Sequence, residues 1–145
     1  MIIVVAGGFD PIHGGHIDHL EKAAKLKESG DKLVVILARE DQLIAKKGFS
    51  FYQSYETRRK IMASLNMVDE VFRNIDTDTG CAETLKLLKP KFFVKGGDRT
   101  PDNMPVKEIL ACQEIGCTIV YGQGDLLDSS TKLAWRLENM PKSND

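Results

Sequence analysis

Short apolar runs of strand length alternate along this chain with segments of helical period. The expected strands are Ile2–Ala6, Leu33–Ala38, Val71–Phe72, Phe92–Val94 and Thr118–Tyr121. The expected helices are His16–Glu28, about Ser54–Asn66, Ala82–Leu88, Val106–Ile115 and Ser130–Glu138. Strands that alternate with helices favour a doubly wound parallel sheet, and a continuous β-branched run such as Leu33–Ala38 is typical of a strand covered on both faces. We therefore predict an α/β fold with a five-stranded parallel sheet.

Length and composition favour a single domain. The 145 residues, 42% of them hydrophobic, suffice for one substantial core. We expect this domain to cover residues 1–140, with Pro141–Asp145 as a polar tail. The formal net charge of −1 provides no basic field for nucleic acid, so an anionic ligand must be met by local groups. We expect that ligand to be a small molecule.

The cysteines and the N-terminus favour a cytoplasmic protein. Cys81, Cys112 and Cys117 are odd in number and lack C-x-x-C spacing, so we expect reduced core residues. The chain starts directly with a strand and has no basic leader. Its apolar runs are all much shorter than a membrane span, so we expect no membrane partner.

The segment after the first strand is rich in glycine and histidine. It reads GGFDPIHGGH over residues 7–16, and its glycines are Gly7, Gly8, Gly14 and Gly15. Glycines let the backbone approach a ligand closely, and the helix that follows adds free N–H groups and the positive end of its dipole. His13 and His16 are three residues apart, so both imidazoles lie on one side of the helix start if the turn is already helical there. The segment therefore predicts a phosphate site with two hydrogen-bond donors for phosphoryl transfer.

Two lysines follow the second strand. Lys46 and Lys47 lie in an expected loop, Arg39–Lys47, ahead of the aromatic-rich stretch Phe49–Tyr55. Cations in a loop above the sheet suit a triphosphate, whereas a lysine pair is otherwise typical of a solvated surface. Because ligands of doubly wound sheets bind beyond the carboxyl ends of the strands, this position favours the ligand.

Polar segments also follow the fourth and fifth strands. The glycines within Lys95–Asp98 permit backbone contact with a base or ribose, and Asp98 can accept from a sugar hydroxyl; the alternative is an ordinary turn with a helix-capping carboxylate. Ser129, Ser130 and Thr131 open the last expected helix. There they either cap its N–H groups or hold a β- or γ-phosphate.

Several of these segments resemble one enzyme family. G-x-F-D followed by H-x-G-H, over residues 7–16, is similar to the signature of nucleotidyltransferases related to the cytidylyltransferases. FYQSYETRR at 51–59 resembles glycerol-3-phosphate cytidylyltransferases, and K-G-G-D-x-x-P at 95–101 resembles heptose 1-phosphate adenylyltransferases. Ser130 and Thr131 match the family's last helix start, so the likeness spans residues 2–137. It implies a Rossmann-like sheet that transfers a nucleoside monophosphate from ATP or CTP to a small phosphorylated sugar or polyol and releases pyrophosphate.

Roles for individual residues follow from this likeness and from the chemistry. His13 and His16 would donate to the triphosphate, and Lys47 would hold the attacking and reacting phosphates together. Asp10 would orient the loop or the acceptor, and Arg58 would support the loop or contact the acceptor. The candidate binding residues are Gly7, Gly8, Phe9, Asp10, Gly15, Lys46, Arg58, Lys95, Gly96, Gly97, Asp98, Arg99, Ser129, Ser130 and Thr131.

The chain departs from the cytidylyltransferase pattern in lacking one arginine. Those enzymes usually carry an arginine a few residues before the serine, and this chain has none between Tyr121 and Ser129. Arg99 is a possible substitute from another loop. Arg59 matches no family position, so we expect it at the surface.

The likeness also implies a magnesium ion carried mainly by the nucleotide phosphates, because magnesium keeps waters and needs few protein ligands. His13, His16 and His19 offer an alternative zinc site, but no fourth ligand is near in sequence, so we expect no metal site on the protein itself. A homodimer is implied, with Trp135 or the stretch 49–55 as candidate contacts. Burial in the core is the alternative fate of Trp135.

Two other function classes share this architecture. A nucleotide-binding sensor or regulatory subunit would keep the pocket without turnover, and the intact histidine pair argues against it. A flavodoxin-like or receiver domain has a similar sheet. A receiver needs clustered acidic residues after its first strand, where this chain has glycines and histidines.

Overall fold

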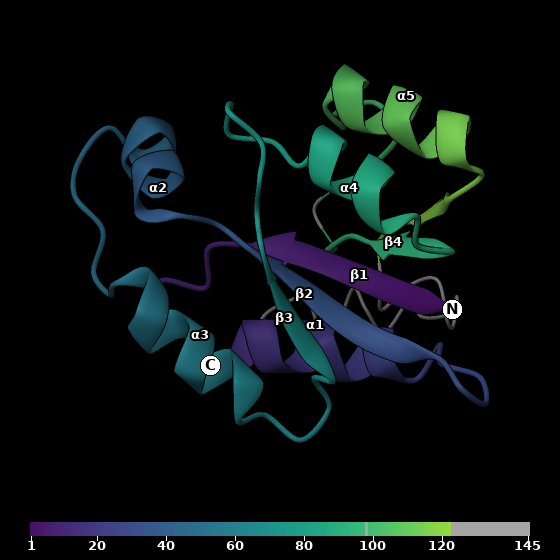
Figure 1. The fold of residues 1–145 in the computed structure, drawn as a ribbon, viewed down its shortest axis with the longest axis horizontal. Coiled ribbons are helices and arrows are strands. Elements are labelled where there is room, and N and C mark those ends of the chain that lie inside the picture. The colour runs from purple at the N-terminus through teal and green to yellow at the C-terminus, as the bar shows by residue number, and fades with distance from the viewer. Residues whose placement is uncertain (98, 123–145) are drawn as a thin grey trace.

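The computed structural model describes residues 1–97 and 99–122, and within them five parallel strands form one sheet (Figure 1). The strands are β1 (Ile2–Gly7), β2 (Lys32–Leu37), β3 (Glu70–Arg73), β4 (Phe92–Val94) and β5 (Thr118–Val120). The helices are α1 (Gly14–Ala24), α2 (Glu40–Lys47), α3 (Tyr55–Ala63), α4 (Ala82–Leu88) and α5 (Val106–Ile115). The strand order β3-β2-β1-β4-β5, with β1 central, is doubly wound. The predicted fold class is confirmed.

Helices cover both faces of the sheet, with α1 and α3 on one side and α4 and α5 on the other (Figure 1). Successive residues of β1 point to opposite faces, so Val5 packs with Leu20 of α1, whereas Val4 packs with Leu85 of α4. All three residues of β1 from Ile3 to Val5 are fully buried. The three cysteines are free and buried, as predicted.

The prediction of a loop at 39–47 is wrong, because most of this segment forms helix α2. Its N-cap is Arg39, which lacks the short polar side chain that signals a helix start, and only Gln42 and Leu43 of the helix are buried. Acidic residues in its first turn, lysines in its last turn and Gly48 at its left-handed C-cap (φ 80°) are signals of a short helix. Lys46 and Lys47 therefore lie on the last turn of a helix.

The predicted bounds of α4, α5 and β4 are confirmed, and the other described boundaries differ by one to four residues. Helix α1 starts two residues earlier than predicted and ends four earlier, because turns leading to Gly30 (φ 86°) follow it. The expected helix Ser130–Glu138, the tail at 141–145, Trp135 and Asp98 fall outside the described residues, as do Ser129, Ser130 and Thr131. Of the helices in 1–97 and 99–122, none combines the length and apolarity needed to cross a membrane.

Candidate active site

The start of α1 carries the two histidines of the glycine-rich segment. His13 is the N-cap residue, and its Nδ1 accepts a hydrogen bond from the Gly15 N–H at 3.1 Å. His16, in the first turn, accepts from the His13 N–H through its own Nδ1 at 3.2 Å. The two rings stack with centroids 3.8 Å apart. Both imidazoles therefore lie together at the helix start, as the spacing predicted.

These caps fix the tautomer of both rings. A neutral imidazole has one N–H, and here each Nδ1 already serves as an acceptor. The proton of each neutral ring is therefore on Nε2, where it is available as a donor. Burial and, secondarily, the neighbouring His13 lower the pKa of His16 to about 4. His16 is thus a neutral hydrogen-bond donor at pH 7.

The Phe9 side chain packs against this histidine pair. Its backbone lies in the left-handed region (φ 48°), which a bulky side chain rarely adopts, and its ring is buried. The ring meets His16 edge-on, with centroids 4.9 Å apart. The Phe9 side chain therefore positions His16, and only the backbone of Phe9 is available to a ligand.

A third histidine, His19, lies one turn further along α1 and is partly buried. Its Nδ1 is sealed from solvent and bonds to no described residue. Burial, with help from the charge of Lys95, lowers the pKa of His19 to about 4. Because His16 and His19 bind protons more weakly in the folded chain than in the unfolded chain, stability is greatest above pH 6.5 and falls as the pH drops towards 4.

Acidification from about pH 6.5 to about pH 5 is therefore expected to lower the thermal midpoint before most carboxylates titrate. His19→Leu removes one of the two groups and should make this decline shallower. Calorimetric melts of both proteins across this range check the expectation. An equal decline in the variant would mean that His19 contributes nothing to the pH dependence.

Asp10 joins the glycine-rich segment to the stretch that follows α2. Its carboxylate accepts from the Tyr52 N–H at 2.8 Å, from the Gln53 N–H at 2.6 Å and from the Lys47 Nζ at 3.0 Å. Burial by itself would raise the pKa of Asp10, but these three donors outweigh it and lower that pKa. Asp10 thus orients the loop, which was one of its two predicted roles, and it fixes Lys47 beside the histidine segment.

Arg58 supports the same loop from inside. Only 1% of this residue is exposed, and its guanidinium donates to the carbonyl oxygens of Gly8 (3.1 Å), Ala38 (2.7 Å) and Gln53 (3.0 Å). Those carbonyls follow β1, follow β2 and precede α3, so one side chain ties three segments together. Of its two predicted roles, the geometry fits loop support, because a buried guanidinium cannot reach an acceptor. Arg59, in contrast, pairs with Glu56 near the surface.

A cavity of about 410 Å³ lies beside the loop, at the carboxyl ends of the strands. Gly7, Gly8 and Lys46 line it, as do Lys95 and Arg99, so the cavity brings together predicted residues from three segments. Leu43 of α2 packs so closely on Gly8 that a Cβ there would lie 2.5 Å from the Leu43 side chain. Much of the remaining wall comes from the segment after β3 and from the start of α5, including Asn74, Asp78, Cys81 and Glu108.

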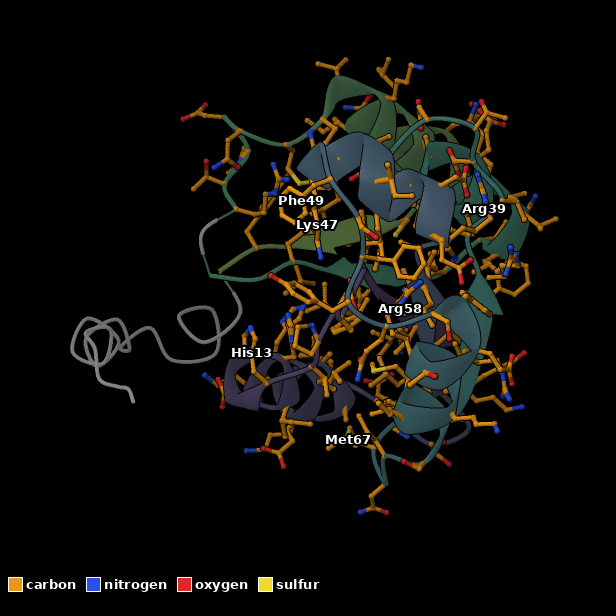
Figure 2. The ribbon with its side chains drawn as sticks, turned by 90° about the vertical axis from the view of Figure 1, so that its left-hand side faces the viewer. His13, Arg39, Lys47, Phe49, Arg58 and Met67 are labelled. Carbon is orange, nitrogen blue, oxygen red and sulfur yellow. The ribbon has the colours of Figure 1, made fainter. Side chains whose placement is uncertain are left out.

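The catalytic candidates flank this cavity without lining it. His13 at the start of α1 and Lys47 at the end of α2 lie on the same side of the molecule, and Arg58 lies further inside (Figure 2). Lys47 is linked to the histidine segment through Asp10, and Gly8 of that segment forms cavity wall. The two groups of residues are therefore neighbours across one loop.

Some predicted binding residues are placed differently. The Gly15 N–H is occupied by the His13 cap, and Gly96 and Gly97 are not in the cavity wall. Arg99 lines the cavity and donates to the Asn103 carbonyl at 2.5 Å. Within the described ranges, no three His, Cys, Asp or Glu side chains are grouped as a metal site would require.

Comparisons with known proteins point to one family. A cytidylyltransferase-like family model matches residues 4–134. The chain is 30% identical to an FAD synthase of Methanothermobacter thermautotrophicus, over 99% of this chain and 95% of that protein. An FAD synthase of Thermococcus sibiricus is 34% identical over 81% of this chain and 77% of its own length. The bifunctional protein HldE of Gluconobacter oxydans is 32% identical over 97% of this chain, which corresponds to 28% of that longer protein.

A solved structure supports the fold. The lipopolysaccharide core biosynthesis protein from Thermoplasma volcanium superposes with a TM-score of 0.66, over 83% of this chain and 93% of that one. Its sequence is 24% identical, so this likeness concerns the fold alone.

Proposed function

The chain belongs to the cytidylyltransferase-like family of nucleotidyltransferases, and on this basis we propose that it transfers AMP from ATP to the phosphate of a small phosphorylated polyol or sugar. Relatives named FAD synthase and HldE support ATP over CTP, because the first joins AMP to FMN and the second contains a heptose 1-phosphate adenylyltransferase. FMN carries its phosphate on a ribityl chain, so both acceptors are phosphate esters of polyhydroxylated molecules.

The capped histidine pair is the observation that carries this proposal. An acceptor phosphate oxygen forms a bond to the α-phosphorus of ATP, and the bond from that phosphorus to the bridging oxygen of pyrophosphate breaks. Pyrophosphate leaves with the electron pair, and negative charge shifts towards it. The Nε2–H groups of His13 and His16 are fixed donors for that charge. The acceptor phosphate is already deprotonated at neutral pH and needs no base.

Lys47 is the proposed cation on the opposite side of the phosphates. Its ammonium has three N–H donors, and two of them are directed at the carboxylate and the carbonyl oxygen of Asp10, at 3.0 and 3.3 Å. The ammonium also lies 4.9 Å from the centroid of the Tyr52 ring, and its third N–H is the one proposed for the phosphates between ATP and acceptor. Asp10 thus holds Lys47 in place, and its carboxylate offsets part of the positive charge of the lysine. The acceptor itself would occupy the adjacent cavity.

Magnesium is proposed to arrive with the nucleotide, held mainly by phosphate oxygens and water. The side chains around the loop fit an ion that is held by the phosphates. The Asp10 carboxylate is already bonded to three N–H donors, and the histidines offer N–H groups to phosphate oxygens. The bound ion would neutralise part of the charge of the triphosphate.

A homodimer is part of the same proposal. Phe49 and Tyr52, from the stretch predicted as a contact, are 59% and 71% exposed, and such aromatic side chains suit an interface. The mass of the chain in solution, measured by light scattering, tests this point.

The function is tested by incubating the full chain with magnesium, either ATP or CTP, and one acceptor at a time. Suitable acceptors are FMN, a heptose 1-phosphate and glycerol 3-phosphate. We expect pyrophosphate with ATP and at least one acceptor, and a product heavier than that acceptor by one adenylyl group. A thermal shift with ATP but no pyrophosphate from any acceptor would contradict transfer and favour the nucleotide sensor.

A further inference from the structure

Two opposite charges face the cavity without pairing with each other. Lys95 follows β4, and its ammonium lies 4.6 Å from the centroid of the Phe93 ring. Glu108, in the first turn of α5, is only 5% exposed. Within residues 1–97 and 99–122, neither side chain forms an ion pair within 4 Å. A buried carboxylate and a partly buried ammonium left apart in this way are costly, and a ligand between them would compensate.

Glu108 presents one free oxygen to the cavity. Its Oε2 accepts from the Cys81 N–H at 3.2 Å and lies 3.6 Å from the Cys81 thiol. Its Oε1 accepts no hydrogen bond from the described part of the chain, and it is not among the atoms there that are sealed from solvent without a partner. Oε1 is therefore accessible, and an ionised carboxylate oxygen can only accept hydrogen bonds.

Several other polar side chains of the cavity wall already have partners. Gln42 donates to the carbonyl oxygens of Asp76 and Asp78, and Asn74 donates to the Gly80 carbonyl. The Asp78 carboxylate accepts from the Gly80 N–H at 3.0 Å and from Lys107 at 3.1 Å. These groups shape the wall and have little capacity left for a ligand.

The remaining charge of the wall is positive. With Asp78 paired to Lys107, the cavity retains Lys46, Lys95 and Arg99 against the carboxylate of Glu108. This balance attracts a phosphate and repels an acceptor that carries an ammonium group. Burial lowers the pKa of Lys95, an effect that an anion bound beside it would oppose.

We propose that Glu108 selects the acceptor: its Oε1 accepts a hydrogen bond from a hydroxyl of a phosphorylated polyhydroxy molecule whose phosphate lies beside Lys95. This inference rests on the proposed nucleotidyl transfer. It assigns Lys95, which the sequence analysis named only as a binding residue, to the acceptor phosphate. The hydroxyls can belong to a sugar ring or to the polyol chain of a larger ester such as FMN, and the two sources share the same chemistry.

The test compares wild type with Glu108→Gln, which keeps the shape of the side chain and an acceptor for the Cys81 N–H. With the best hydroxylated acceptor, we expect KM for the acceptor to rise about 10-fold or more, because the contact loses its charge. KM for ATP and kcat at saturating acceptor should change little. Glu114→Gln, the same change at an exposed position of α5, is the matched control and should leave all three values unaltered.

A ligand-side comparison keeps the test decisive if Glu108→Gln folds poorly. Wild type should use glycerol 3-phosphate at least about 10-fold better, in kcat/KM, than ethyl phosphate, which lacks hydroxyls, and better than phosphoethanolamine, which carries an ammonium. Parallel arms with FMN and a heptose 1-phosphate identify the source of the hydroxyls. Equal kcat/KM for hydroxylated and hydroxyl-free phosphates would overturn the inference.

Failure of the inference is distinguishable from failure of the proposed function. Absence of pyrophosphate with every acceptor would contradict transfer. In that case calorimetric titration of glycerol 3-phosphate into wild type and Glu108→Gln, without nucleotide, still decides the role of Glu108. Tighter binding by wild type supports it, and equal binding refutes it.

Discussion

His16→Ala is expected to lower kcat by about 10²- to 10³-fold while the chain remains folded. The imidazole is neutral and its Nδ1 accepts from the His13 N–H, so its Nε2–H is a donor fixed before the substrate arrives. Alanine removes that donor at the point where charge shifts towards the leaving pyrophosphate. The substitution also frees the His13 N–H, but at an exposed helix start where water can replace the lost partner.

Steady-state pyrophosphate release and thermal melts together check this expectation. Asp18→Asn, on an exposed position of the same helix, serves as the control and should keep both the rate and the melting midpoint. A near-normal rate for His16→Ala would remove this histidine from the mechanism. A collapsed midpoint would show that the cap stabilises the fold more than the geometry suggests.

Arg58→Met is expected to reduce the free energy of unfolding by about 3 kcal/mol or more. Three backbone carbonyls, at Gly8, Ala38 and Gln53, lose the donor that the buried guanidinium supplies. Methionine fills part of the space but donates nothing. Because Gly8 belongs to the histidine segment, the surviving folded protein should also turn over more slowly.

The neighbouring arginine provides a matched control. Arg59 pairs with the exposed Glu56 on the same helix, so Arg59→Met should change stability little. Urea unfolding of both variants separates the two roles. Equal destabilisation by the two substitutions would contradict the assignment of Arg58 as the support of the loop.

The sequence predicted the sheet well because its strands are continuous apolar runs between clear turn signals. It missed α2, whose start lacks a short polar cap and whose buried residues are only the polar Gln42 and the apolar Leu43. The glycine-rich segment was correctly predicted to lie at the start of a helix. The hydrogen bonds that Nδ1 of His13 and Nδ1 of His16 accept could not be predicted from local patterns, because they depend on ring orientation.

The sequence predicted the part of the cavity wall that follows β1, β2 and β4, but not the part after β3 and at the start of α5, because these segments lie up to about a hundred residues from the glycine-rich segment. Glu108 was missed for this reason, since an acidic residue in a first helical turn is ordinary. A signal did exist: Glu108 shares a helix face with Ala111 and Cys112, both buried, at spacings of three and four. Arg58 gave a similar signal, lying between Tyr55 and Met62 on the buried face of α3.

The most direct test of nucleotidyl transfer at this site follows a labelled oxygen. The acceptor phosphate is prepared with ¹⁸O, reacted with ATP, and both products are analysed by mass spectrometry. Direct attack on the α-phosphorus predicts that every labelled oxygen stays in the AMP-containing product, one of them as the bridge, and that pyrophosphate carries none. Release of orthophosphate and ADP, or an acceptor recovered unchanged while ATP is hydrolysed, would contradict it.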